Sequence, residues 1–347
     1  MNTWTKAVAV GLGAPLAVAL FVLAFMWPMA TQTPKDVPLA IVGNAQQVEQ
    51  VTAAFESTKP GLFDITTVDT REGAITLIEQ REVSGAVVLG PSPELLTAPA
   101  AGTAHNAIIS NLRAPLQEMA AKAAAAMPVP AGARPADAQP ANTQPANTQP
   151  AGAPTVTVTE VAPLSASDAS GMVLNMSVIP IAMGGIIGAA LTSFALRSNA
   201  QRLVALLVYT PLAGALVTGL VGGAFDLLPG SFWSVAGVYA LGIGAVSCLV
   251  VGLRSLIGKA GFALGALFVM LLSNPLAGTL APKEFIAGGW GYVGQYLPIG
   301  AAVDLLRSVN YFPQASIAHN VWTLAGYVFA GLLLLGIGAA RQRKLMS

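Results

Sequence analysis

The chain has 347 residues, of which 54% are hydrophobic and only 10% are charged, and its mean hydropathy is +0.65. Soluble domains carry roughly 25% charged residues, so this composition argues against a soluble protein and for a membrane protein. The net charge of +1 gives no reason to expect a nucleic-acid partner, and a single cysteine excludes a disulfide within the chain.

Six long apolar runs divide the sequence, and none of them contains Asp, Glu, Lys, Arg or His. Each run is roughly 20 residues long, which at 1.5 Å per residue is enough to cross a hydrocarbon core of about 30 Å. We therefore expect an α-helical membrane protein with six transmembrane helices, the first (within residues 1–30) being an uncleaved signal anchor. The runs are 7–27, 172–196, 203–225, 232–253, 262–280 and 321–340.

Basic and acidic residues are sorted along this chain. When the six runs are threaded alternately, one side receives eight of the 17 basic residues and none of the 16 acidic ones. By the positive-inside rule this side is cytoplasmic. Both termini are therefore expected on the cytoplasmic side of a bacterial plasma membrane, and residues 31–171 on its outer side. The eight are Lys6, Arg197, Arg202, Arg254, Lys259, Arg341, Arg343 and Lys344.

Residues 31–171 alternate between strand and helix patterns, which predicts an α/β extracytoplasmic domain inserted between the first and second membrane helices. Short apolar or alternating segments predict strands at 37–42, 64–69 and 85–89, with a possible edge strand at 95–98. Asn44 is placed to cap a helix, and a second helix is expected over 70–82. This β-α-β-α-β order implies a parallel sheet.

The rest of this domain holds one apolar stripe and one low-complexity segment. An Ala-rich helical stretch over 103–127 has Ile108, Leu112, Leu116 and Met119 on one face, and Pro115 should kink it or begin a second helix. Residues 128–154 repeat QPANT, which predicts a disordered, extended loop. The alternating segment 155–161 should return to the sheet as a strand.

The five-helix membrane domain (172–347) contains an outer segment, 281–316, that is rich in aromatic residues. Ile299 to Val309 has an amphipathic helical pattern, in which Asp304 and Arg307 are spaced to form a local ion pair. We expect this segment to lie flat on the outer leaflet or to dip into it, with Trp290, Pro298, Asp304 and Arg307 as its marker residues.

No catalytic or cofactor motif emerges from the sequence. The segment GLRSLIGK at 252–259 has five residues between its glycines instead of four, and Ala260 stands where a phosphate-binding loop needs a hydroxyl. His105 and His319 have no partner at metal-ligand spacing, and we expect both to be solvated or at helix ends. The chain is therefore predicted not to be an enzyme and to need no cofactor.

The membrane runs contain only neutral polar groups, so proton-coupled transport is not expected. If the chain transports a substrate, the path would be lined by neutral polar residues of the second and fifth runs, namely Asn175, Ser177, Ser273 and Asn274. The energy would then come from a partner that docks on the small basic cytoplasmic face, at Arg197, Arg202, Arg254 and Lys259.

Several phrases carry a resemblance to a known family: NPLAG, then LPIGAAVDLLRSVNYF before the last helix, and LAIVGN, REVSGAVVLGPS and VAPLSASDASG in the outer domain. With its one-plus-five helix order, the chain resembles the membrane subunits of type 2 ABC exporters, and it is most similar to actinobacterial members of the YhgE and phage infection protein branch.

The resemblance implies a half-transporter that forms a homo- or heterodimer with another membrane subunit. It also implies a cytoplasmic ATPase partner and the export of lipids, drugs or other amphipathic compounds. A second hypothesis is a non-transporting envelope protein whose outer domain binds a partner or organises the cell wall. A stoichiometric ATPase in the purified complex would separate the two.

Overall fold

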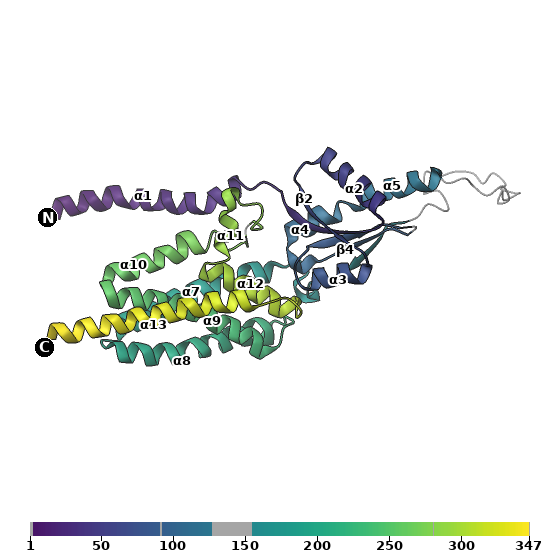
Figure 1. Ribbon diagram of the computed structural model, residues 1–347. Coiled ribbons are helices and arrows are strands. Elements are labelled where there is room, and N and C mark those ends of the chain that lie inside the picture. Colours follow the sequence, from purple (N-terminus) through teal and green to yellow (C-terminus); the bar gives the residue numbers. More distant parts are fainter. Residues whose placement is uncertain (1–2, 91, 127–154, 280, 347) are drawn as a thin grey trace, which may run out of the picture.

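A computed structural model describes residues 3–90, 92–126, 155–279 and 281–346. The chain forms two parts, an α/β region (residues 37–126 and 155–171) and a helical bundle (residues 172–346), which meet end to end (Figure 1). The first helix, α1 (Thr3–Ala30), runs beside the bundle and leads into the sheet. The predicted disordered loop 128–154 lies outside the described residues.

Five strands form one mixed sheet in the order β2-β1-β3-β4-β5. The first three strands are parallel, as predicted, but β4 runs antiparallel to β3. The strand predicted at 95–98 is present as β4, and the return strand predicted over 155–161 is present as β5, but β4 is not at the edge of the sheet, because β5 pairs with it in parallel. The strands are β1 (Val37–Val42), β2 (Phe63–Val68), β3 (Gly85–Val88), β4 (Glu94–Thr97) and β5 (Thr157–Glu160).

Helices cover both faces of this sheet (Figure 1). Because side chains alternate along a strand, β1 directs Leu39 and Ile41 into one core and Ala40 and Val42 into the other. The first core packs against α2 (Ala45–Thr58), α4 (Thr103–Ser110) and α5 (Arg113–Ala126), and the second packs against α3 (Arg71–Glu79).

Local sequence sets where these helices begin. Asn44 and Gln47 form a capping box at the start of α2, as the sequence predicted for Asn44, and Thr70 caps α3. The stretch 103–127 is divided into α4 and α5, and Pro115 occupies the first turn of α5, where a missing N–H costs nothing. Leu112 and Leu116 of the predicted stripe are buried.

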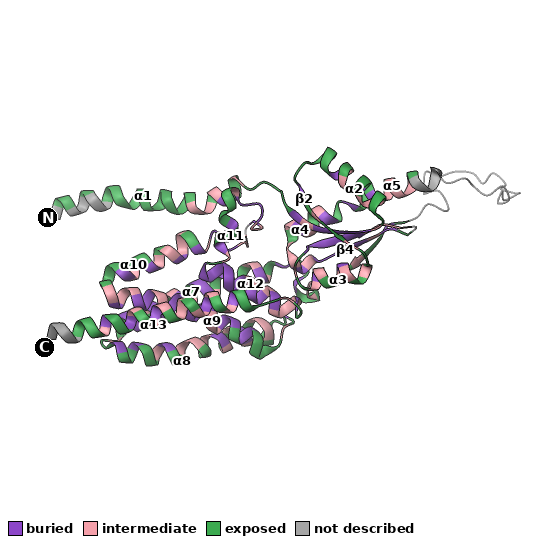
Figure 2. Ribbon diagram, in the orientation of Figure 1, coloured by how far each residue is buried: buried purple, intermediate pink, exposed green. Residues whose placement is uncertain are grey.

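Helix α9 (Phe232–Ile257) is the central helix of the bundle. In its apolar 18-residue stretch 78% of the residues are buried, whereas in that of α1 only 6% are buried. Figure 2 shows this contrast along the two helices. The other helices of the bundle are α6 (Met172–Met176), α7 (Val178–Ala195), α8 (Asn199–Thr218, followed by a π-helical turn Gly219–Ala224), α10 (Lys259–Leu267, followed by a π-helical turn Phe268–Ser273), α11 (Trp290–Gly294), α12 (Pro298–Tyr311) and α13 (Ala318–Met346).

Five helices in the described chain are long and apolar enough to cross a membrane. The fifth predicted run, 262–280, forms a shorter apolar helix over Lys259–Ser273 and then turns. Asn274 and Pro275 mark this turn, since a helix is disfavoured at the residue before a proline.

Small residues let α9 contact its neighbours closely. A Cβ on Gly331 of α13 would lie 2.2 Å from the Cys248 backbone of α9, and one on Gly252 would lie 2.3 Å from the Gly331 carbonyl oxygen. Such spacing is typical of membrane helices whose backbones touch. The α9–α13 pair is therefore packed backbone to backbone.

Candidate functional site at the junction of the α/β region and the bundle

The segment that follows α10 joins the two parts of the molecule. Phe285 is 3% exposed and belongs to the core beneath α2, α4 and α5, while Phe312, at the end of α12, is 1% exposed and belongs to the core beneath α3. Thr33 donates a backbone hydrogen bond to the Phe285 carbonyl (3.1 Å). The two ends of the segment 281–316 therefore pack into the α/β region.

Helix α12 is accordingly a buried helix. Most of its side chains are inaccessible, and it contacts α6, α7, α9 and α13. Of the two arrangements expected for this segment, lying flat on the outer leaflet does not fit α12, because its polar face meets the α/β region instead of water. Pro298 is buried at the first turn, and Trp290, in α11, is 45% exposed.

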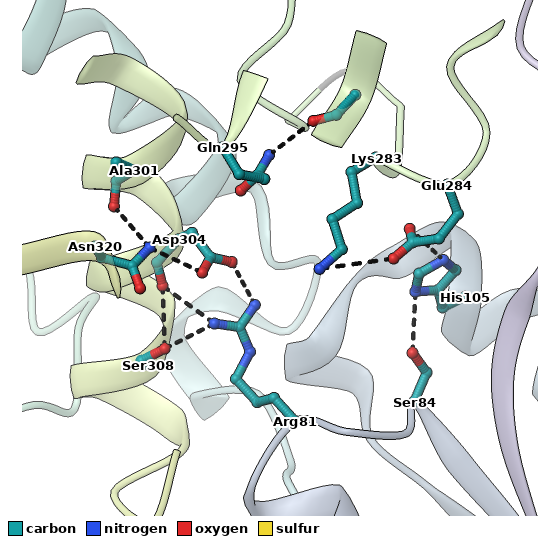
Figure 3. Close-up of polar contacts among 11 residues, drawn as sticks. Arg81, Ser84, His105, Lys283, Glu284, Gln295, Ala301, Asp304, Ser308 and Asn320 are labelled. Carbon is teal, nitrogen blue, oxygen red and sulfur yellow. Dashed lines mark hydrogen bonds and ion pairs between the residues drawn. The ribbon is translucent and has the colours of Figure 1, made fainter. Parts of the chain in front are cut away.

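An ion pair from Arg81 to Asp304 crosses the junction (Figure 3). The Arg81 guanidinium lies 2.5 Å from the Asp304 carboxylate and donates to the Ser308 hydroxyl at 2.7 Å. Asn320 of α13 donates to the second Asp304 oxygen at 3.1 Å. The predicted partner of Asp304 was Arg307, one turn along the same helix, so that prediction was wrong.

Charge sets the ionisation of this cluster. Burial opposes ionisation of Asp304, but the charge and hydrogen bond of Arg81 outweigh it and hold the pKa of Asp304 well below its usual range. Burial and the nearby Arg81 charge lower the pKa of Arg307 to about 10. Both groups therefore stay charged at neutral pH.

A second polar cluster lies beside the first. His105 of α4 is buried, its Nδ1 lies 3.1 Å from the Ser84 hydroxyl, and its Nε2 lies 3.4 Å from Glu284. Lys283 approaches the other Glu284 oxygen at 3.8 Å. Burial raises the pKa of Glu284, but the hydrogen bond and charge of His105 bring it below its usual value. His105 lies in the first turn of α4, at a helix end as expected, but it is buried and not solvated, whereas His319 is exposed near the start of α13.

A cavity of about 170 Å³ lies between the two clusters. Its walls come from the loop after α3, the first turn of α4, the segment 277–284 and α12. No group of His, Cys, Asp and Glu in the described chain could hold a metal ion. Charged and polar side chains line the cavity, which is therefore suited to holding a charged or polar group.

The predicted path residues do not line a common space. Asn175 lines the junction cavity. Ser177 is buried and bonds to the Tyr239 hydroxyl (3.0 Å), and Ser273 accepts a hydrogen bond from the Ile299 amide (3.0 Å), while Asn274 follows the π-helical turn. Ser177 and Ser273 thus fix helix contacts in this conformation.

The four basic residues predicted to face a partner are in different environments. Arg197 and Lys259 are exposed. Arg202 is only 6% exposed and donates to Asn199 and to the Ser193 and Leu196 carbonyls, so it caps the end of α7. Arg254 is half-buried against the Phe194 ring (5.4 Å).

Sequence reasoning missed Arg81, His105, Lys283 and Glu284. Arg81 and Asp304 are 223 positions apart, so no local pattern links them. The one available signal was a Lys-Glu dipeptide at 283–284 in an otherwise apolar and aromatic stretch.

Together, several membrane-length helices and a charged junction define a multi-pass membrane protein with an ordered α/β region. The chain matches the family described as ABC-2 family transporter protein over residues 10–340, and it belongs to that family. This makes it a permease-type membrane subunit, a class that works with an ATPase partner and is not itself catalytic. Comparison with curated proteins and with solved structures gave no match.

Proposed function

We propose that this chain is the export permease of an ABC-type transporter in the YhgE and phage infection protein branch, and that it moves lipids or other amphipathic compounds. In this proposal six helices cross the membrane, α10 with its π-helical turn being the shortest. Both termini are cytoplasmic, residues 31–171 form the extracytoplasmic domain, residues 172–347 form the membrane domain, and the subunit acts as a homo- or heterodimer.

The family match over residues 10–340 carries this proposal. Two further features support it. The six apolar runs contain no Asp, Glu or His that could relay protons, which favours an energy source outside the membrane helices. The turns at Arg197 and Lys259 expose basic side chains at the end of the bundle away from the sheet, where an ATPase would dock (Figure 1).

Purification from the native membrane tests the assignment. We expect a stoichiometric ATPase to copurify, and we expect the Arg197→Glu/Lys259→Glu double variant to lose it because the charge of its docking surface is reversed. Arg113→Glu, at an exposed arginine of α5, is the matched control and should retain the ATPase. Arg202 is unsuitable for this test, since it is buried and caps α7.

Recovery of the wild-type chain with envelope proteins alone would contradict the export proposal and support the non-transporting alternative. Retention of the ATPase by the double variant would instead contradict the docking surface.

A further inference from the structure

The junction cavity is lined by three cationic and three carboxylate side chains. Arg81, Lys283 and Arg307 line it, together with the carboxylates of Asp304 and Glu284, and a third carboxylate, Glu82, is exposed to solvent. Arg81 and Asp304 neutralise each other at 2.5 Å. Glu284 is shared between Lys283 and His105. Among the described residues this leaves Arg307 as the cation of the cavity that no ion pair neutralises, and Glu82 as a carboxylate exposed to solvent.

The Arg307 guanidinium group lacks part of its hydrogen bonding. Its Nε is buried and has no hydrogen-bond partner among the residues that the structure describes. A buried guanidinium nitrogen without an acceptor is costly, and Arg presents a planar fork of donors that matches a phosphate or carboxylate group. Arg307 lines the cavity, so an anion there would lie beside its guanidinium group and offset its charge.

The first turn of α4 adds donors to the same wall. Residues 101–105 line the cavity, and no side chain caps the helix at Gly102. The first amide groups of a helix have no partner within the helix, and their partial positive charge favours an anion. The Arg307 cation and the N-terminus of α4 are therefore two independent features that line the same cavity.

Aromatic residues place this cavity at the depth of a membrane interface. Trp290 and Tyr292 of α11 are 45% and 49% exposed, and the Lys283 ammonium lies 5.9 Å from the Tyr292 ring. Exposed Trp and Tyr are typical of the headgroup level of a bilayer. The volume of about 170 Å³ has room for several waters and hence for one small oxyanion.

We infer that this cavity binds a phosphate group, held by Arg307, Lys283 and the first-turn amides of α4. The phosphate could be supplied by a lipid headgroup or by free phosphate. The site goes beyond the export assignment and does not depend on it, because the residues that form it all belong to this chain and no ATPase is required for binding.

Thermal unfolding of the purified full-length protein in detergent tests this inference, since a ligand that binds the folded state raises the unfolding temperature. The probes are inorganic phosphate, dihexanoyl phosphatidate and, as the phosphate-free match, dihexanoylglycerol. We expect at least one phosphate probe to stabilise the wild type and dihexanoylglycerol to have no effect. Stabilisation by phosphatidate alone identifies a lipid headgroup, and stabilisation by both phosphate probes identifies a site open to free phosphate.

Two variants locate the binding. Arg307→Gln should weaken phosphate binding at least about tenfold, because a charge-assisted contact is lost. Ala104→Asp should do the same by placing a carboxylate within the cavity wall; because Ala104 also packs partly against the α/β core, circular dichroism first establishes that this variant folds. Arg113→Gln, on the surface of α5, is the control and should bind as the wild type does.

The inference is overturned if neither phosphate probe stabilises the wild type, if dihexanoylglycerol stabilises it equally, or if Ala104→Asp binds like the wild type. Ala104→Asp decides the question even if Arg307→Gln fails to fold.

Discussion

Arg81 reaches the bundle because of its own backbone. It follows the last turn of α3 with a positive φ of 63°, a conformation that is uncommon for a residue with a side chain and that ends the helix. The side chain is then directed at α12, where it contacts Asp304 and Ser308 and lies 5.5 Å from the Phe312 ring. One residue thus links the α/β region to the bundle.

Replacing Arg81 should destabilise the folded protein. Arg81→Met leaves Asp304 with only Asn320 as a hydrogen-bond partner, and we expect a loss of about 2 kcal/mol, the typical worth of hydrogen bonds to a charged group. Unfolding of the purified protein in detergent measures this loss of stability. The Arg81→Met/Asp304→Asn double variant should recover part of the loss, because it removes the carboxylate that Arg81→Met leaves without its cationic partner. Equal stability of the wild type and Arg81→Met would show that the pair contributes nothing.

Glu94 holds the edge of the sheet through charge. Its carboxylate accepts two hydrogen bonds from Arg71 of α3 (2.6 and 2.8 Å) and one from Thr159 of β5 (2.6 Å). The hydrogen bond from Arg71 is the main reason that the pKa of Glu94 is lowered, although burial opposes the shift. The stabilisation is therefore present above the unfolded-state pKa, about 4.3, and is lost as the pH falls through the lower folded-state pKa.

Amide hydrogen exchange should detect this contact. In Glu94→Gln we expect residues 157–161 to exchange roughly fivefold faster than in the wild type at pH 7, since β5 is an edge strand that opens locally. The difference should persist to about pH 5 and shrink below about pH 4. Thr159→Val, which removes one hydrogen-bond donor to the carboxylate but leaves the charge pair with Arg71, should show a smaller effect at every pH. A difference between wild type and Glu94→Gln that grows on acidification would contradict the assignment.

His105 shows why single residues in this site escaped prediction. On the sequence it is a lone histidine within an Ala-rich helix, and nothing nearby marks it as buried. Its partner Glu284 lies 179 positions later, and its ring packs edge-on against Phe285 (5.3 Å). Histidine burial here is set by the junction, which forms only after the bundle and the sheet have met.

At the scale of secondary-structure elements, sequence periodicity predicted the helices and strands whose formation depends on neighbouring residues. The bounds of β1 and the cap of α2 could be predicted because both depend on neighbouring residues. The direction of β4 and the burial of α12 could not. An amphipathic helix has the same pattern whether its polar face meets a membrane surface or another part of the protein, as the residues around Asp304 illustrate.

Two glycines of α13, one in contact with α9 and one without a neighbour, form a matched pair that tests the packing of these helices. Gly331→Ala places a methyl group against the Cys248 backbone and should force the helices apart, at a cost of about 2 kcal/mol, as is typical of overpacking. Gly336→Ala, one turn and a half further along α13, has no atom within 4 Å of the new Cβ and should be neutral or stabilising. Unfolding of each variant in detergent measures the difference. Equal behaviour of the two variants would show that α9 and α13 do not touch as described.

At the scale of the whole molecule, charge sorting and the arrangement of the two parts agree. The α/β region lies at the end of the bundle opposite to the short basic turns (Figure 1). The sequence predicted this separation because the positive-inside rule depends on charge counts between runs and not on tertiary contacts. How the α/β region is fixed to the bundle could not be predicted, since that depends on pairs such as Arg81 and Asp304.

Cysteine labelling tests the orientation directly, because the single native cysteine, Cys248, is buried in α9 and should not react. Ala45→Cys and Ala200→Cys both place an exposed thiol in the first turn of a helix that begins with a capping box. In intact cells a membrane-impermeant maleimide should label Ala45→Cys and not Ala200→Cys. After the membrane is opened, both should be labelled. The reverse pattern in intact cells would place the α/β region in the cytoplasm.

The contrast in burial between α1 and α9 determines how each helix tolerates substitution. The exposed side chains of α1 contact the protein mainly near Trp27, so most exchanges among Leu, Val, Phe and Ala there preserve what the helix needs, which is hydropathy. In α9 the same exchanges change volume inside a close-packed interior. Substitutions that accumulate in evolution should therefore vary freely among apolar residue types along α1. Along α9 they should be restricted to side chains of similar volume.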